Sequence, residues 1–393
     1  MQFLKFKSLL PAAALAVLCS CSTFDEEKIT LDGERISVLD GETALQPDYA
    51  PGQVKIVLPA PYTNTAWSQN GGNAAHMMGH LSSDSKLKEL WESGFGEGSS
   101  KRDFLIAAPV SAHKAVFTID ADGIVNAFRL DDGRKIWKRR LKPLIKDDIS
   151  TSLKGAGLAV FDKKVYATTG FGAVFALDMV TGKKLWRYDT ELPIRIAPTA
   201  ERGVVFIQTI DNKLIALNGV DGSVLWDYKS PSEETTLVGG ASPAYSPQQD
   251  TIVAAFSNGE LRAFKASTGS PLWSDILVSR KRTNSPANIN AIKANPVIDG
   301  STVYAVGNNN ILVAIDLRSG ARIWEREIGS INQPWVAGKF MFVLSNNYDL
   351  FAIEKATGKI VWNTQIPLGK TKEDKVGVTA SGPVLTLSLI HIS

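Results

Sequence analysis

Residues 312–324 read Leu312-Val313-Ala314-Ile315-Asp316-Leu317-Arg318-Ser319-Gly320-Ala321-Arg322-Ile323-Trp324, and within them lies a pattern, Ala-x5-Gly-x3-Trp, that recurs along the chain. The pattern occurs six times with no slip in its spacing. The copies are Ala127-Gly133-Trp137, Ala176-Gly182-Trp186, Ala216-Gly222-Trp226, Ala263-Gly269-Trp273, Ala314-Gly320-Trp324 and Ala352-Gly358-Trp362. Internal periodicity of this kind predicts a protein built from repeated structural units.

Each copy predicts a β-hairpin. An aliphatic residue stands two positions before the Ala and an apolar residue follows it, which is the alternation of a half-buried strand. Asp, Thr or Ser then precedes the Gly, whose tolerance of positive φ suits a tight turn. A second strand opens on the Trp, and further short strands lie upstream.

The spacing of the repeats fits one architecture. Successive tryptophans are 49, 40, 47, 51 and 38 residues apart, close to the roughly 40–50 residues of a four-stranded propeller blade. We therefore predict an all-β fold, a β-propeller in which the tryptophan of each blade packs against the neighbouring blade. The predicted docking residues are Trp137, Trp186, Trp226, Trp273, Trp324 and Trp362.

The repeat resembles the Trp-docking motif of the quinoprotein, or PQQ-like, propellers, over residues from about 66 to 386. The stretch Ile315–Asn332 is similar to the corresponding blade of the BamB family, the propeller lipoproteins of the outer-membrane β-barrel assembly (BAM) machinery. The resemblance implies eight blades in the intact protein, whereas six are complete in this sequence. It also implies that Leu87–Gly94, with Trp91, forms an outer strand that closes the ring, and that Ser381–Leu385 begins another blade.

Two readings of the last residues remain open. Residues 387–393 resemble a translated sequencing-adapter end, so we expect the natural chain to diverge near Thr386 and to continue. A genuine short C-terminus would instead leave an open ring with an exposed strand edge.

The first residues predict export. Lys5 and Lys7 precede an apolar run, Leu9–Leu18, that is too short to cross a bilayer as a helix but suits a signal peptide, assigned here to residues 1–20. The run ends in Leu18-Cys19-Ser20-Cys21, which resembles the bacterial lipobox and makes Cys21 the predicted lipid acceptor. An ordinary cleaved signal peptide with incidental cysteines is the alternative.

A lipid at Cys21 would anchor the chain to a membrane without crossing it. Ser22 follows the acceptor, which favours the periplasmic face of the outer membrane of a Gram-negative bacterium. Residues 21–65, which contain four prolines, are predicted to be a lipid-anchored linker to a propeller spanning residues 66–386.

Charge and cysteine content limit the partners and the cross-links that we expect. The formal net charge is +3, which gives no electrostatic reason to expect a nucleic acid as partner. Both cysteines lie in the leader region, so the mature chain has no pair for a disulfide.

The resemblance implies a scaffold that binds BamA through its POTRA domains, within the BAM complex, and assists unfolded outer-membrane proteins to insert. Leu237 and Val238 match one docking loop of the family, and Asn290–Lys293 matches another. Leu237 keeps the family's exposed leucine. Val238 replaces an arginine, and Ala291 and Lys293 replace an acidic pair, which removes the basis for the family's salt bridges but not for the surface. Strand addition at an exposed blade edge is a second possible mode of binding.

Two rival functions belong to other classes. A PQQ-dependent dehydrogenase needs Ca²⁺ on oxygen ligands and a catalytic carboxylate, and those enzymes commonly have adjacent cysteines that the mature body lacks. His76 and His80 stand four apart among glycines that favour a loop, with no third ligand cluster, so we predict no metal, no cofactor and no enzymatic activity. The other rival is a lipoprotein that binds a polysaccharide or other small molecule in the central channel.

Overall fold

The computed structural model describes residues 45–84, 88–100, 105–144, 155–232, 239–277, 290–366, 382–386 and 389–392. All of these belong to Leu45–Ser393, one of the two units into which the chain divides. Cys21, the predicted signal peptide, Leu237 and Val238 lie outside the described residues. None of the residues in the described ranges is helical, and accordingly none forms a helix long and apolar enough to cross a membrane.

The described strands form six four-stranded antiparallel sheets, numbered here as blades one to six. Blade one contains β1 (Val110–Ala112), β2 (Ala115–Ile119), β3 (Ile124–Arg129) and β4 (Lys135–Arg140), and blade two contains β5 (Gly155–Phe161), β6 (Lys164–Thr169), β7 (Ala173–Asp178) and β8 (Lys184–Asp189). Blade three contains β9 (Thr199–Glu201), β10 (Val204–Gln208), β11 (Lys213–Asn218) and β12 (Val224–Lys229), and blade four contains β13 (Ala244–Ser246), β14 (Thr251–Ala255), β15 (Glu260–Lys265) and β16 (Pro271–Ile276). Blade five contains β17 (Val297–Asp299), β18 (Thr302–Gly307), β19 (Ile311–Asp316) and β20 (Arg322–Arg326), and blade six contains β21 (Trp335–Ala337), β22 (Phe340–Leu344), β23 (Asp349–Glu354) and β24 (Ile360–Gln365).

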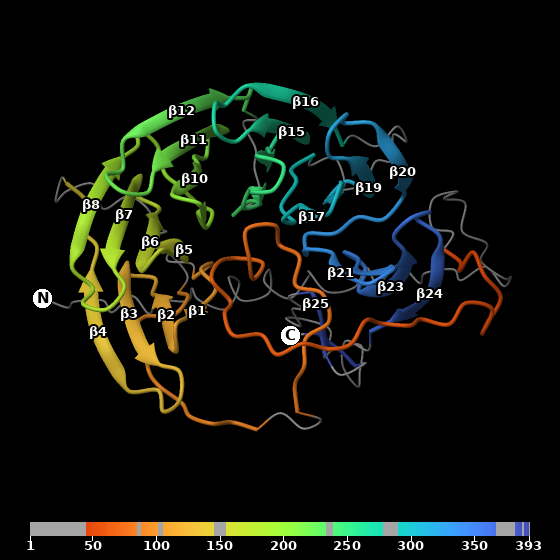
Figure 1. Cartoon of the computed structure of the whole chain (residues 1–393), viewed down its shortest axis with the longest axis horizontal. Coiled ribbons are helices and arrows are strands. Elements are labelled where there is room, and N and C mark those ends of the chain that lie inside the picture. The colour runs from red at the N-terminus through yellow and green to blue at the C-terminus, as the bar shows by residue number, and fades with distance from the viewer. Residues whose placement is uncertain are drawn as a thin grey trace, which may run out of the picture. The chain divides into compact units, whose positions relative to one another are not determined.

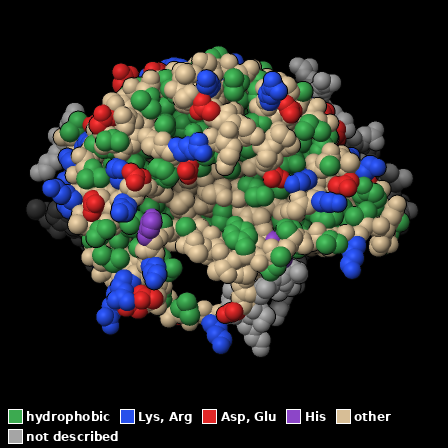
Figure 2. All heavy atoms as spheres, in the orientation of Figure 1, with side chains coloured by type: hydrophobic (Ala, Val, Ile, Leu, Met, Phe, Trp, Pro, Cys, Tyr) green, Lys and Arg blue, Asp and Glu red, His purple; other side chains and the backbone are tan. Residues whose placement is uncertain are grey.

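Within each blade the strands pair in chain order. In Figure 1 the blades follow one another along an arc, with the first strand of each blade innermost and the fourth outermost. The prediction of a β-propeller with six complete blades is confirmed. Both signs of charge are interspersed over the face of the molecule in Figure 2.

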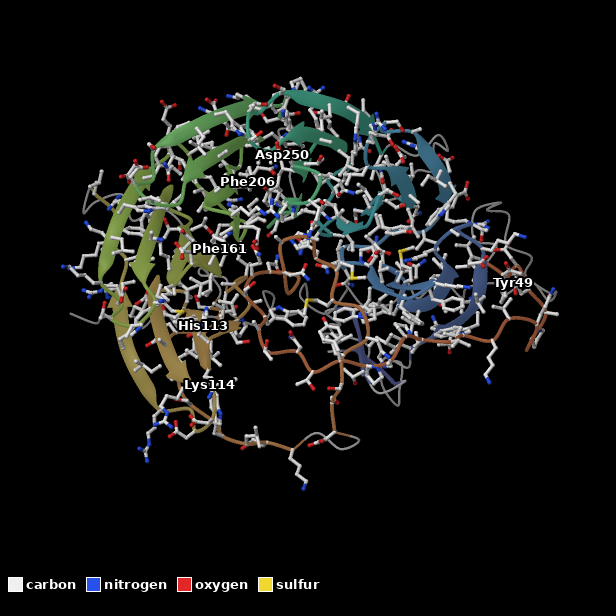
Figure 3. The ribbon with its side chains drawn as sticks, viewed as in Figure 1. Tyr49, His113, Lys114, Phe161, Phe206 and Asp250 are labelled. Carbon is white, nitrogen blue, oxygen red and sulfur yellow. The ribbon has the colours of Figure 1, made fainter. Side chains whose placement is uncertain are left out.

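The constant spacing of the six repeats is explained by the position of the Ala between two neighbouring strands of the sheet. In blade three, Ala216 pairs with Phe206 on one neighbouring strand and with Trp226 on the other, and the two rings meet with centroids 5.9 Å apart (Figure 3). A larger side chain at this fully buried position would separate the rings. The equivalent alanines of the other blades pair with their tryptophans in the same way: Ala127, Ala176, Ala263, Ala314 and Ala352.

The tryptophans of blades one to five each contact the blade that follows. Trp273 in blade four donates a hydrogen bond from Nε1 to the carbonyl oxygen of Leu317 in blade five, at 2.7 Å. Its ring covers Gly320, where a Cβ would lie 2.6 Å from the Trp273 side chain and where φ is +74°. Only glycine satisfies both demands. The same indole-to-carbonyl bond joins Trp91 to Leu130, Trp137 to Met179, Trp186 to Gly219, Trp226 to Ala266 and Trp324 to Lys355.

The two ends of this series depart from the expectation. Trp91 was expected in an outer strand, but residues 88–100 contain no strand; the Trp91 indole bonds to Leu130, and Phe95 and Glu97 bond to Asn126 and Ala121 of blade one and its turn. Trp362 is partly buried against Phe342 of its own blade, with ring centroids 6.3 Å apart, and its indole makes no such bond to a following blade within the described residues. The indole bond to a following blade is therefore made by the tryptophans from Trp91 to Trp324 and not by Trp362 among the described residues.

Part of the predicted linker lies along blade six. Asp48 accepts a hydrogen bond from the backbone of Ile360 at 2.6 Å, and its own backbone N–H donates to the Ile360 carbonyl at 2.8 Å. Tyr49 donates its hydroxyl to Glu354 at 3.0 Å beside the same blade (Figure 3). Val54 and Ile56 pack on the apolar cluster of blade six. The alternating apolar residues of this Pro-rich stretch explain why it is bound rather than extended away.

A short sheet follows blade six. β25 (Pro383–Thr386) pairs with β26 (Leu389–Ile392), which falls within the stretch expected to be an adapter sequence. Leu385 of β25 joins the core cluster that contains Trp335 of β21. β25 therefore occupies the place beside blade six where the sequence predicted that another blade begins.

Candidate functional site

A segment of irregular chain, residues 67–81, crosses the middle of the ring and is called the strap here. It hydrogen-bonds to the first strand, or the residue just before it, in every blade, although the blades lie far apart in sequence. The contacts of the strap are Trp67 with Ser111, Ser68 with Val160, Gln69 with Ala200, Ala74 with Tyr245, Ala75 with Ile298, Gly79 with Trp335 and Leu81 with Leu385. The strap is the coil that passes inside the arc in Figure 1. It therefore connects the inner edges of all six blades.

The two strap histidines are structural in the described residues. His76 is 2% exposed, and its Nδ1 lies 2.7 Å from the carbonyl oxygen of Pro296, so this nitrogen must carry the proton. Burial lowers the pKa of His76 to about 4, and the imidazole is neutral at pH 7. His80 bonds through Nδ1 to the carbonyl of Pro59 at 2.7 Å. No cluster of three or more His, Cys, Asp or Glu suited to a metal occurs among the residues with described positions.

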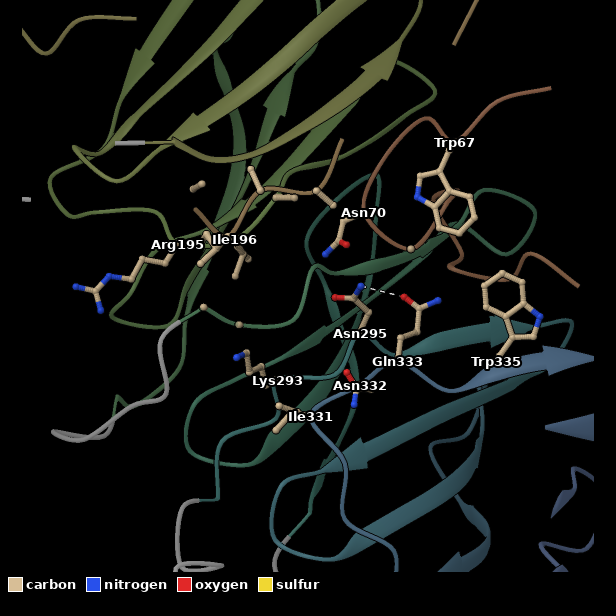
Figure 4. Close-up of a pocket in the computed structure, with 18 of the residues that line it drawn as sticks. Trp67, Asn70, Arg195, Ile196, Lys293, Asn295, Ile331, Asn332, Gln333 and Trp335 are labelled. Atoms are coloured by element: carbon tan, nitrogen blue, oxygen red, sulfur yellow. Dashed lines mark hydrogen bonds between the residues drawn. The ribbon is translucent and has the colours of Figure 1, made fainter. Parts of the chain in front are cut away.

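A pocket of about 470 Å³ lies against the strap (Figure 4). Trp67, Asn70 and Gly71 of the strap line it on one side. Its other walls come from the loops that enter the inner strands, with Arg195, Gly239, Gly240, Lys293, Asn295 and Gln333, and from Trp335 at the start of β21. The volume is within the range of sites that hold small molecules.

Side-chain amides form a connected row at the base of the pocket. Asn70 donates to the Ser242 hydroxyl at 3.1 Å, and the Ser242 backbone N–H donates to the Asn295 amide oxygen at 2.8 Å. Asn295, 7% exposed, donates to Gln333 at 3.0 Å, and Gln333 donates to the His76 carbonyl at 2.9 Å. These bonds fix the orientation of the amides and use one N–H of each NH₂ group. A second N–H remains on each.

The described lining is cationic. Lys293 and Arg195 line the pocket, and no acidic side chain is among its described lining residues. Neither cation pairs with a carboxylate in the described ranges. In Figure 4 the Lys293 and Arg195 side chains both point to the side of the pocket away from Asn295 and Gln333. Ca²⁺ with a quinone requires several oxygen ligands including carboxylates, so these side chains do not fit that group.

The predicted partner loops begin or end at this pocket. Gly239 and Gly240, which follow Leu237 and Val238 in the chain, line it, as does Lys293 of the second loop. Ala291 and Ile292 of that loop are 5% and 2% exposed, so the replacement of an acidic residue by Ala291 lies in the interior and not on the surface. Lys293 is the partly exposed member of the pair.

Sequence reasoning missed the amide row and Trp67. A signal was present, because a proline precedes the first strand of several blades and the residue before that proline faces the channel. Asn295 precedes Pro296 and Gln333 precedes Pro334, and both line the pocket. Nothing in the local pattern marks Asn70, which reaches the site only because the strap crosses the ring.

Comparisons with known proteins agree on one family. A family model described as outer membrane protein assembly factor BamB matches residues 121–364, more than half of the chain. A relative of that name from Yersinia pestis is 28% identical over 247 residues, covering 62% of this chain and 62% of the relative, so the match spans less than two thirds of that protein. Another from Shewanella oneidensis is 26% identical over 337 residues, covering 84% of this chain and 73% of the relative.

Two crystal structures are similar in fold. BamB from Moraxella catarrhalis has a TM-score of 0.57 at 18% identity, covering 66% of this chain and 75% of that chain. The quinohemoprotein alcohol dehydrogenase from Comamonas testosteroni has the same TM-score at 14% identity, covering 82% of this chain and 69% of that chain. At these identities the structures establish the propeller fold alone, and the family follows from the sequence match. The chain belongs to the BamB family of outer membrane protein assembly factors.

Proposed function

We propose that this chain is a non-enzymatic scaffold of outer-membrane protein assembly, held at the periplasmic face of the outer membrane by a lipid on Cys21. Its partner is BamA, bound through the POTRA domains, and its clients are unfolded outer-membrane proteins. The family match supports the role in assembly. A rigid ring that positions loops suits a binding protein.

The observation that carries the choice of surface is the meeting of two loops. Gly239 and Lys293 line one pocket, and the Gly239 Cβ position lies 3.6 Å from Cε of Lys293. Gly239, two residues after Leu237 in the chain, thus adjoins the loop Asn290–Lys293, and a single partner domain can contact both loops on this proposal.

Changing Leu237 to Asp is expected to abolish co-purification of BamA, because a charge at the centre of an apolar contact must be desolvated without a partner. Leu185→Asp is the matched control, since Leu185 is 46% exposed on β8 of blade two, outside both loops. The readout is the amount of BamA retained on the tagged full chain after detergent extraction. Equal retention by both variants would remove this surface from the proposal.

Changing Cys21 to Ser is expected to move the protein from the membrane to the soluble periplasmic fraction, because the acyl chains supply the anchoring energy. Cys19→Ser is the control, and it is expected to leave the protein in the membrane fraction. Fractionation with incorporation of labelled palmitate measures both. Palmitate on Cys21→Ser but not on Cys19→Ser would assign the lipid to the other cysteine.

A further inference from the structure

The strap forms one wall of the central pocket. Trp67, Asn70 and Gly71 line the pocket, and the segment that contains them is bonded to the first strand of each of the six blades. A pocket of about 470 Å³ suits a small molecule or the end of a chain.

The groups around the pocket select the occupant by hydrogen bonding. Asn70, Asn295 and Gln333 each keep an amide N–H beyond the bond that orients the group. The amide oxygens of Asn295 and Gln333 already accept bonds, from Ser242 and Asn295 respectively. The base of the pocket is thus rich in donors and fits a ligand rich in acceptors, such as successive peptide carbonyls.

Charge selects which end of a chain fits. Lys293 and Arg195 line the pocket without a described carboxylate partner, and in Figure 4 both side chains point to the side away from Asn295 and Gln333. An α-carboxylate beside Lys293 gains a charge-assisted hydrogen bond, whereas an α-ammonium would be repelled. Trp67 and Trp335, whose rings stack with centroids 6.2 Å apart, supply an apolar wall for a terminal side chain.

We propose that this pocket binds the carboxyl-terminal end of a polypeptide, with the α-carboxylate at Lys293 and the preceding carbonyls at the row Asn70, Asn295 and Gln333. The inference rests on the proposed function in taking a polypeptide as the ligand. The volume of about 470 Å³ accommodates the last few residues and not a folded domain.

Isothermal titration of the purified full chain with N-acetyl-Ala-Ala-Leu tests the proposal, using the free acid and the carboxamide of the same peptide at low salt. The acid is expected to bind at least about tenfold more tightly than the amide, because the amide loses the charged bond to Lys293. Lys293→Met is expected to lower affinity for the acid about tenfold and to remove the preference, and Lys293→Arg to retain it. Lys183→Met, an exposed lysine on the hairpin of blade two, is the control and is expected to bind as the parent does.

Three results would overturn the proposal: no heat with either peptide, equal affinity for acid and amide, or competition by glucuronate as strong as that by the peptide acid. The last would identify an acidic sugar as the better ligand. The titration contains no BamA, so its failure is separate from failure of the proposed function. Loss of BamA capture in Leu237→Asp together with absent peptide binding would refute this inference alone.

Discussion

Trp273→Ala is expected to lower the free energy of unfolding by about 3–5 kcal/mol, the range for removing a large buried aromatic side chain. Trp273 is 9% exposed, and its indole bond to Leu317 is part of the contact between blades four and five. The substitution opens a cavity over Gly320 and leaves the Leu317 carbonyl without its donor. Urea unfolding followed by far-ultraviolet circular dichroism measures the loss without relying on tryptophan fluorescence.

Trp362→Ala is the matched control, because it removes the same side chain from the same position of the repeat. Trp362 packs on its own blade and donates to no following blade in the described part of the chain. We expect a loss of about half that of Trp273→Ala or less. Equal losses would show that the contact between blades contributes little and that packing within the blade dominates.

Acidification from pH 7 to pH 4 is expected to remove about 3 kcal/mol of stability through His76 alone. Burial lowers the pKa of His76 from 6.5 to about 4 in the folded chain, whereas the unfolded chain keeps the ordinary pKa. Between these two pKa values the unfolded state binds more protons, so stability falls as the pH falls. The contribution is fully present above pH 6.5 and is lost toward pH 4.

The measurement is the difference in unfolding free energy between the parent and His76→Asn at each pH. Asn retains an N–H donor for the Pro296 carbonyl but does not titrate. The variant is expected to be less stable at pH 7, with the gap closing on acidification, since carboxylates elsewhere titrate in both proteins and cancel. A gap that stays constant with pH would place the acid sensitivity in other groups.

Local rules made the blades predictable. The turn at Gly320 needs positive φ, Ala216 fits only a small side chain, and the tryptophans recur at fixed distance from both, so spacing alone reveals the hairpins. A further signal went unused, because an aromatic residue stands ten positions before the Ala in most repeats, as Phe206 does before Ala216. It is the ring that meets the tryptophan across the sheet.

The pocket could not be predicted in the same way. Asn70 and Gln333 are more than 250 residues apart in the sequence. They converge because the strap crosses the ring, and no sequence period marks that path. The bonds of Gln69 to Ala200 and of Ala75 to Ile298 have no periodic signature. Long-range placement of irregular chain is set by the assembled tertiary structure, which single-sequence patterns do not encode.

The junctions formed by the tryptophans all face the same way along the chain. At each junction from Trp91 to Trp324, a tryptophan indole donates a hydrogen bond to a backbone carbonyl of the blade that follows it in the chain. The glycine turn of that following blade lies under the indole. Duplication or loss of one blade would therefore leave this hydrogen bond intact at each remaining junction between blades. Whole blades can therefore be gained or lost with this shared bond preserved, whereas contacts such as the ion pair of Arg322 with Asp275 belong to one junction.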